Sequence, residues 1–342
     1  MSGRGALQLR RKASLAAIIG VGLAVGAPFA LGGSAVLGSL RDVAPQLFMI
    51  LAGLSVVSAA AKAGKLQILL LRLGQRPPFL RTLAISLATD FAFLSSPAGA
   101  AGYAVNVALL GRAGTSWTAA TAVVGAEQAL DLVFFAVVTP VAFISASVPL
   151  ARVVPRIPES VYMALVAATL LAALGLWSGR HLVVATVHSF VRATPWFQAR
   201  QERIGEFVAE LRKQMGTLIE GDTNQNIVLI MLTALQWLTR YGVLWVVLLE
   251  LGYRLPFEFV WALQAGVLHL AQWTGIPAGG GSADLAFAAA LEPWVLSPAM
   301  ATVLLLWRLA TLYVPLIVGA LSLAALACNA RSCEANDNVR RR

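Results

Sequence analysis

The sequence predicts an all-α polytopic membrane protein built from two inverted repeats, with about six full spans and two re-entrant helical hairpins. Of the 342 residues, 58% are hydrophobic and only 12% are charged, whereas soluble domains typically carry roughly 25% charged residues. Long apolar segments recur along the chain. A helix-breaking Pro-Ala-Gly run occurs twice, at 96–102 and 276–282, with the two prolines 277 − 97 = 180 residues apart.

Six apolar segments are near or above the ~20 residues that a helix needs to cross the hydrocarbon core. They are residues 14–37, 45–64, 116–149, 160–178, 226–250 and 298–327. The first follows a basic stretch, so a cleaved signal peptide is an alternative there, but its apolar run is long for one and we expect a retained span.

The basic residues explain the topology. The net charge is +10, and the positive-inside rule assigns most Lys and Arg to cytoplasmic loops if both termini are cytoplasmic. Only Arg41, Arg152, Arg156 and Arg254 then lie outside. Because the charge is accounted for in this way, we expect the bilayer and no nucleic acid as a partner.

The basic loop at 62–81 and Arg112 are both expected on the cytoplasmic side, so the segment between them must enter the membrane and return. We predict a hairpin with arms at 82–95 and 99–111 and its tip at Pro97. The second half repeats the pattern with arms at 257–275 and 282–291. A full crossing by 257–275, with the tip at one surface, is the alternative. Each half has an odd number of crossings, so the second copy inserts upside down and the tips can meet near the midplane.

The domain boundaries follow from these segments. We expect a first transmembrane repeat at 1–150, a segment at 151–225, the rest of the second repeat at 226–327 and a basic cytoplasmic tail at 328–342. The segment 151–225 contains the span 160–178 and an amphipathic helix at 197–219. We interpret that helix as a connector lying on the membrane, with a regulatory or partner-binding helix as the alternative.

The two tips supply the first group of candidate substrate-binding residues. Non-helical backbone cannot face lipid, so each tip must be enclosed by protein or line a watery cavity. The arm that follows each tip begins there and turns its positive helix end inward, which favours an anion such as a phosphate. The alternative is that small residues simply let helices pack closely. The tip candidates are Pro97, Gly99, Gly102, Pro277, Gly279 and Gly280.

Ionisable and polar residues inside apolar segments supply the second group, because such groups are costly in lipid and usually face an interior or a cavity. Opposite signs predict that Arg240 or Arg308 pairs with Glu127 or Asp131, and a purely structural pair is the alternative. Arginine also suits bidentate phosphate binding. The candidates are Glu127, Asp131, Arg240, His269, Gln272, Asp284 and Arg308, with Asp90 as a further buried charge.

Catalysis has little support in the sequence. There is no His-Glu-x-x-His, no Gly-x-Ser-x-Gly and no His or Cys cluster at metal spacing. Ser95 and Ser96 lie beside the first tip without an evident base. We expect no enzyme activity, no cofactor and no metal.

Several of these residues resemble one family. The run from Asp90 to Ala104 with its Ser-Pro-Ala-Gly core, the pair Glu127 and Asp131, and the second tip followed by Arg308 are similar to the flippase-like transmembrane family. That family is named after the membrane region of lysylphosphatidylglycerol synthases. The resemblance implies a bacterial inner-membrane protein that moves or handles a lipid with an anionic head group, with lipid-synthesis enzymes as possible partners.

The chain departs from that family in two ways. Many members carry an acidic residue and an arginine just after the first tip, where this chain has Ala101-Gly102-Tyr103-Ala104. No synthase domain follows Arg342, so aminoacyl transfer is not expected from this chain alone. We therefore expect a flippase-like protein, with a secondary transporter of a small anion or a non-transporting accessory protein as the alternatives.

Overall fold

The computed structural model describes residues 43–146 and 201–340, together with a few single positions before residue 43. All elements in these ranges are helical. The expected spans at 14–37 and 160–178 lie outside the described residues. In chain order the elements are α3 (Pro45–Arg72), α4 (Phe79–Ser95), the 3-10 turn η1 (Pro97–Gly99), α5 (Ala100–Arg112), α6 (Trp117–Ser145), α11 (Gln201–Ile219), α12 (Thr223–Glu250), α13 (Phe257–Trp273), the 3-10 turn η2 (Pro277–Gly279), α14 (Ser282–Leu291), α15 (Ser297–Arg308), the π-helical turn η3 (Leu309–Tyr313) and α16 (Val314–Arg340).

Four helices in the described part of the chain are long and apolar enough to cross a membrane. They are Pro45–Arg72, Trp117–Ser145, Thr223–Glu250 and Ala299–Cys328, the last of which runs through α15, η3 and α16. They correspond to the spans expected at 45–64, 116–149, 226–250 and 298–327. Each carries large apolar side chains on its outer surface, among them Met49, Val137, Ile230 and Leu321. These outward residues give the protein an apolar surface that suits lipid.

The two halves contain matching elements in the same order. The helices α3 and α12 each have 28 residues, and α4 and α13 each have 17. Their starting residues differ by 223 − 45 = 178 and 257 − 79 = 178. Both tips are three-residue Pro-Ala-Gly turns, and their central residues Ala98 and Ala278 have φ values of 50° and 52°. The sequence repeat is thus a repeat of backbone structure.

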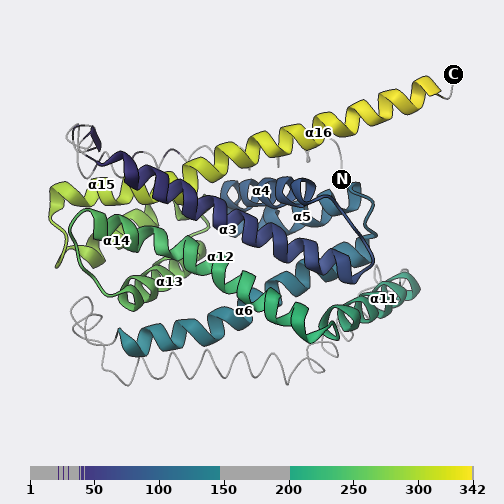
Figure 1. Ribbon diagram of the computed structural model, residues 1–342, viewed down its shortest axis with the longest axis horizontal. Helices are drawn as coiled ribbons and strands as arrows, with labels where there is room; N and C mark the ends of the chain where they lie inside the picture. Colours follow the sequence, from purple (N-terminus) through teal and green to yellow (C-terminus); the bar gives the residue numbers. More distant parts are fainter. Residues whose placement is uncertain are drawn as a thin grey trace.

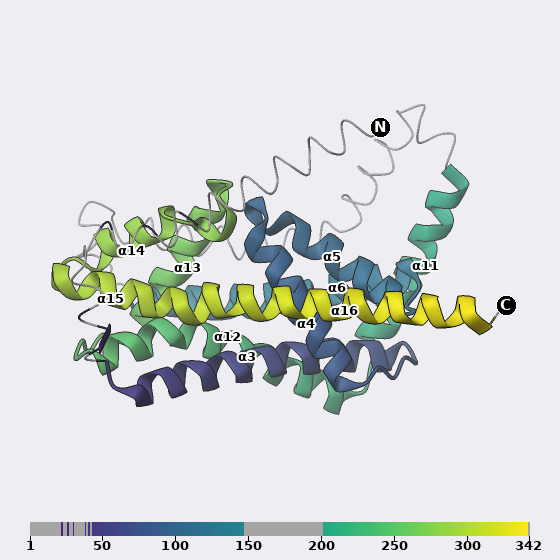
Figure 2. The same cartoon turned by 90° about the horizontal axis from the view of Figure 1, so that it is seen from above.

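The halves are also interlocked. Helix α3 packs against α12, while α4 packs against α16 and α13 packs against α6. The turn η1 contacts η2, α4 contacts η2, and α13 contacts η1. The hairpin α4–α5 lies toward one end of the long axis and α13–α14 toward the other in both views (Figure 1, Figure 2). Each hairpin therefore packs on the last long helix of the other half, and the two tips meet in the interior.

Helix α13 resembles a hairpin arm more than a full span. At about 1.5 Å rise per residue its length is roughly 26 Å, less than the ~30 Å of the hydrocarbon core. It equals α4 in length and ends beside the first tip. This geometry favours the hairpin expectation over a tip at the surface.

Two glycines permit close approaches that a side chain would block. A Cβ at Gly99, which has φ 72°, would lie 2.5 Å from the Phe93 ring. A Cβ at Gly319 would lie 2.5 Å from the Leu87 carbonyl oxygen. Glycine is therefore required at the first tip and at the contact between α4 and α16.

The expectation of a basic loop from residue 62 is wrong. Helix α3 continues to Arg72, and Lys65 within it is fully buried. Lys62 and Lys65 are both paired with carboxylates on other helices. Ion pairs of this kind offset the cost of burying a cation, and a hydropathy pattern cannot reveal the partner.

The amphipathic helix expected at 197–219 is present as α11 (Gln201–Ile219), and residues 197–200 lie outside the described residues. Leu211, Met215 and Leu218 pack against the core beside α6, whereas Phe207 and Ile219 stay exposed. The apolar surface of α11 is thus partly a protein contact and partly available to a membrane surface.

Candidate functional site

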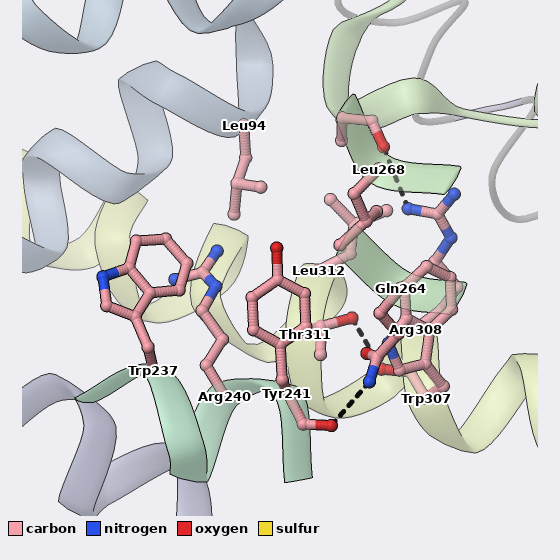
Figure 3. A pocket seen from close by; sticks show the side chains of 11 residues that line it. Leu94, Trp237, Arg240, Tyr241, Gln264, Leu268, Trp307, Arg308, Thr311 and Leu312 are labelled. Atoms are coloured by element: carbon pink, nitrogen blue, oxygen red, sulfur yellow. Dashed lines mark hydrogen bonds between the residues drawn. The ribbon is translucent and has the colours of Figure 1, made fainter. Parts of the chain in front are cut away.

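The two tips and helix α12 enclose a cavity of two adjoining lobes, of about 160 Å³ and about 80 Å³. Arg240 and Tyr241 from α12 and Ala278 from the second tip line both lobes. Ala98 from the first tip lines the larger one. Figure 3 shows the Tyr241 side chain directed toward Leu94, with the Arg240 guanidinium beside it. The left-handed φ of both tip alanines costs about 1 kcal/mol each, so strained backbone lies at the cavity wall.

Arg240 is the loosely held cation of this cavity. Its guanidinium carbon lies 5.9 Å from the centroid of the Trp237 ring, and its Nη1 lies 4.0 Å from Asp90 Oδ2. Among the described residues it donates no hydrogen bond. Its side chain is 29% exposed. Asp90 is held more closely by Lys62, so the positive charge of Arg240 is only partly compensated.

Arg308, in contrast, is fully engaged. Its Nε and Nη2 donate to Asp284 Oδ1 and Oδ2 at 2.8 and 2.7 Å. Its Nη1 and Nη2 donate to the carbonyl oxygens of Ala278 and Gly279 at 3.0 and 3.2 Å. The guanidinium also stacks over Trp307 at 4.5 Å. Arg308 therefore fixes the second tip from inside the protein and has little capacity left for a ligand.

The helix end behind the second tip is occupied by the protein itself. The Gly281 N–H donates to Asp284 Oδ2 at 3.0 Å, which places a carboxylate at the start of α14. At the first tip, the Ser96 hydroxyl accepts a hydrogen bond from the Ala101 N–H at 3.1 Å. The expectation that both helix ends stand open to an anion is therefore wrong for the second tip, because its own Asp284 fills that role.

Glu127 and Asp131 belong to a buried ionic cluster next to the cavity. The Lys65 ammonium lies 2.5 Å from Asp131 Oδ1 and 4.0 Å from Glu127 Oε1. Trp237 Nε1 donates to Asp131 Oδ1 at 2.9 Å. The prediction that Arg240 or Arg308 pairs with these two carboxylates is wrong, since Lys65 holds both. The sequence interpretation missed Lys65 because it placed this residue in a loop.

The rim of the larger lobe lies at α13. His269 and Gln272 line this lobe and are exposed, and Phe135 of α6 lines it as well. The His269 ring contacts Phe135 edge-on, and its Nδ1 hydrogen-bonds the Ala265 carbonyl oxygen at 2.6 Å. The larger lobe is thus lined both by a buried residue, Tyr241, and by exposed residues of α13, His269 and Gln272.

Residues 17–319 match the family model described as the lysylphosphatidylglycerol synthase TM region. The chain belongs to this family. A UPF0104 membrane protein of Archaeoglobus fulgidus is 24% identical to it over 259 residues, which cover 73% of this chain and 77% of that protein. The resemblance expected from the tips and buried charges is confirmed.

The family match includes both tips and the whole cavity. Of the candidate binding residues, six line the cavity and seven do not. Those at the cavity are Gly99, Arg240, His269, Gln272, Gly279 and Arg308. Those away from its walls are Pro97, Gly102, Glu127, Asp131, Pro277, Gly280 and Asp284.

The cavity is also lined by residues that the sequence interpretation missed, chiefly Trp237 and Tyr241. The sequence did contain a signal that Lys62 lies inside a span. Lys62 and Arg240 are 240 − 62 = 178 residues apart, which equals the offset between the matching helices. That offset indicates that Lys62 lies as deep in α3 as Arg240 does in α12.

Proposed function

We propose that this protein binds the anionic, phosphate-bearing head group of a lipid in the cavity between the two tips and moves it across the bilayer. We propose an inner-membrane location with both termini in the cytoplasm, on the basis of the basic residues in the loops. No chemical step is part of the proposal.

Arg240 is the observation that carries this proposal. A cation inside a membrane protein is costly unless it is paired, yet Arg240 donates no hydrogen bond among the described residues and has only the 4.0 Å contact with Asp90. A guanidinium is well shaped for the oxygens of a phosphodiester. An anionic head group entering the cavity would supply the missing partner.

The surroundings of the cavity favour a lipid over a soluble anion. The rim residue His269 is followed by the strongly exposed Leu270, and Val133 and Val137 of α6 are exposed as well. A head group in the cavity therefore has apolar surface nearby for its acyl chains. The family description also names a synthase of lysylphosphatidylglycerol, a lipid that contains a phosphodiester.

The repeated structure suggests how the site could face either side in turn. The two halves make reciprocal contacts through α4 with α16 and α13 with α6. If the second copy is inverted in the membrane, a shift of one hairpin on its partner helix opens the cavity to one side, and the equivalent shift of the other hairpin opens it to the opposite side. The tips, where the hairpins meet, would act as the two gates.

The test is lipid movement in reconstituted vesicles. Phosphatidylcholine vesicles would contain a trace of phosphatidylglycerol labelled on an acyl chain, and a membrane-impermeant quencher would report label that reaches the outer leaflet. We expect the protein to accelerate movement of this lipid over empty vesicles. We expect Arg240→Gln to lower the rate about tenfold or more, the effect of losing a charged hydrogen-bonding partner.

Arg254→Gln is the matched control, because Arg254 is exposed in the loop between α12 and α13. It should leave the rate unchanged. Equal rates in empty and protein-bearing vesicles for every anionic lipid tried would remove the proposal. Flux of inorganic phosphate without lipid movement would instead support the small-anion transporter.

A further inference from the structure

The charges beside the cavity cancel before any ligand arrives. Three cations face three carboxylates in one connected cluster formed by Lys62, Lys65, Arg240, Asp90, Glu127 and Asp131. A phosphate bound at Arg240 would leave this buried cluster with one excess negative charge. Uncompensated charge is strongly unfavourable in a membrane interior. A compensating positive charge must therefore accompany the head group or be taken up when it binds.

Glu127 is the carboxylate least satisfied by its surroundings. It is 1% exposed, and its Oε1 has no hydrogen-bond partner among the described residues. Lys65 lies 4.0 Å from that oxygen, and Asn106 Nδ2 reaches Oε2 only at 3.5 Å. Asn106 is buried too, and its own Oδ1 also lacks a partner. Two neighbouring buried residues thus each hold an acceptor oxygen that has no partner among the described residues.

The other two carboxylates of the cluster are better paired. Asp131 accepts hydrogen bonds from Lys65 and from Trp237 Nε1. Asp90 accepts one from Lys62 and lies near Arg240. A proton added to either would disrupt a direct hydrogen bond to a cation. A proton added to Glu127 would disrupt no direct hydrogen bond to a cation, because the Lys65 ammonium lies 4.0 Å from Oε1.

The charged and titratable groups around Glu127 come from several helices. Lys62 and Lys65 face it from α3, Asp90 from α4 and Asp131 from its own helix α6. From α12, Trp237 and Arg240 reach Asp131 and Asp90 instead. Helix α5 brings Asn106 and the titratable Tyr103 toward Glu127. The other helices on α6 bring Met215 of α11 near Gly125, and His269 of α13 against Phe135. Lys65 is therefore the cation closest to Glu127, and it is shared with Asp131.

We infer that Glu127 is a proton-binding site, and that its carboxylate takes up one proton from water each time an anionic head group binds beside Arg240. This inference rests on the proposed function. The proton converts the carboxylate to a neutral carboxylic acid, which cancels the charge that the phosphate adds. When the head group leaves on the other side, Glu127 releases the proton there. The protein is then a carrier that moves one proton together with one head group.

The decisive experiment measures proton and lipid movement together. Vesicles carrying the protein would contain a trapped pH-sensitive dye and would receive acyl-labelled phosphatidylglycerol on the outside. We expect about one proton to enter per lipid moved, because one proton cancels the single negative charge of the head group. Lipid movement should also be faster at about pH 6 than at about pH 8, because proton supply falls tenfold per pH unit.

Glu127→Gln resembles the protonated state and should move the lipid without proton entry, at rates that are the same at both pH values. Glu292→Gln is the matched control, since Glu292 is exposed at the end of α14, and it should keep both proton entry and pH dependence. Asn106→Ala should keep proton entry but reach the same rate at a higher pH, because the carboxylate loses the N–H that Asn106 donates to it.

Lipid movement by the wild-type protein without proton entry, at rates equal at both pH values, would overturn this inference and leave the proposed function intact. A requirement for sodium in place of protons would overturn it as well. Absence of any lipid movement would remove the proposed function and this inference together. Since the wild-type measurement decides the matter alone, misfolding of a variant does not weaken the test.

Discussion

The two tips share a backbone but differ in how their surroundings hold them. Ala98 and Ala278 have the same left-handed conformation, and each tip ends in a glycine that its neighbours require. At the second tip, Arg308 and Asp284 bind both the carbonyl oxygens and the helix start. At the first tip, Ser96 provides a single weak cap. One tip is thus fixed by an ion pair, while no ion pair among the described residues holds the other.

The difference can be traced to one position. Gly99 and Gly281 immediately precede α5 and α14, and the third residue of each helix is Gly102 in the first copy and Asp284 in the second. Gly102 has no room for a side chain, since a Cβ there would lie 2.8 Å from the Phe93 ring. The repeat therefore preserves the fold of the tips, whereas the start of the following helix differs and carries a structural ion pair only in the second copy.

The largest effect should come from breaking the ion pair at the second tip. Arg308→Gln would leave Asp284 buried without its cation and two carbonyl oxygens without a donor. We expect a loss of roughly 3–5 kcal/mol of stability, the usual cost of breaking a buried pair by removing one partner. Thermal unfolding in detergent measures it. The pair Arg308→Gln with Asp284→Asn should recover part of the loss, and an unchanged melting temperature for Arg308→Gln alone would show that the second tip is not held in this way.

A smaller loss of stability is expected when a cation is removed from the ionic cluster next to the cavity. Lys65→Met fills a similar volume but removes the cation shared by Asp131 and Glu127. We expect a loss of about 2–3 kcal/mol of stability, because two buried carboxylates lose the cation that they share. The loss is smaller than at the second tip because Asp131 keeps its hydrogen bond from Trp237. Arg76→Met, at an exposed position in the loop after α3, is the control and should not change the melting temperature. A Lys65→Met protein as stable as wild type would mean that the cluster does not depend on this cation.

The smallest effect on stability is expected from relieving the backbone strain at the tips, and it tests whether both tips are equally strained. Ala98→Gly and Ala278→Gly each relieve a left-handed alanine, which favours the folded state, but also increase the freedom of the unfolded chain. We expect a net gain of about 0.5 kcal/mol for each variant, equal at both tips because φ is 50° and 52°. Unfolding measurements on the two variants would check this. A gain at one tip and a loss at the other would indicate that the two turns differ in strain.

The sequence was sufficient to predict the elements but not the partners of the buried charges. The four spans, the two tips and the amphipathic helix follow from apolar length and from the position of prolines, which are local properties. Ion pairs such as Lys65 with Asp131 join residues on different helices, and their distances depend on how those helices pack. Hydropathy also ended the predicted span at residue 64, although the helix continues to Arg72.

Arg240 and Arg308 also show that the sequence does not reveal the partners of buried charges. In the sequence, Arg240 and Arg308 are alike, each a lone cation in an apolar segment. In the structure, Arg308 makes four hydrogen bonds and Arg240 has a single 4.0 Å contact with a carboxylate. Only the packing of α15 against the second tip distinguishes a structural arginine from one that is available to a ligand.

If Arg240 binds an anionic head group, such a lipid should stabilise the folded protein through this side chain. The melting temperature of the purified protein would be measured in detergent with added phosphatidylglycerol or phosphatidylcholine. We expect phosphatidylglycerol to raise it by a few degrees over phosphatidylcholine, as a ligand that binds only the folded state must. We expect Arg240→Gln to melt near the wild-type temperature in phosphatidylcholine and to lose the extra stabilisation. An equal stabilisation of Arg240→Gln and wild type by phosphatidylglycerol would show that Arg240 does not bind the head group.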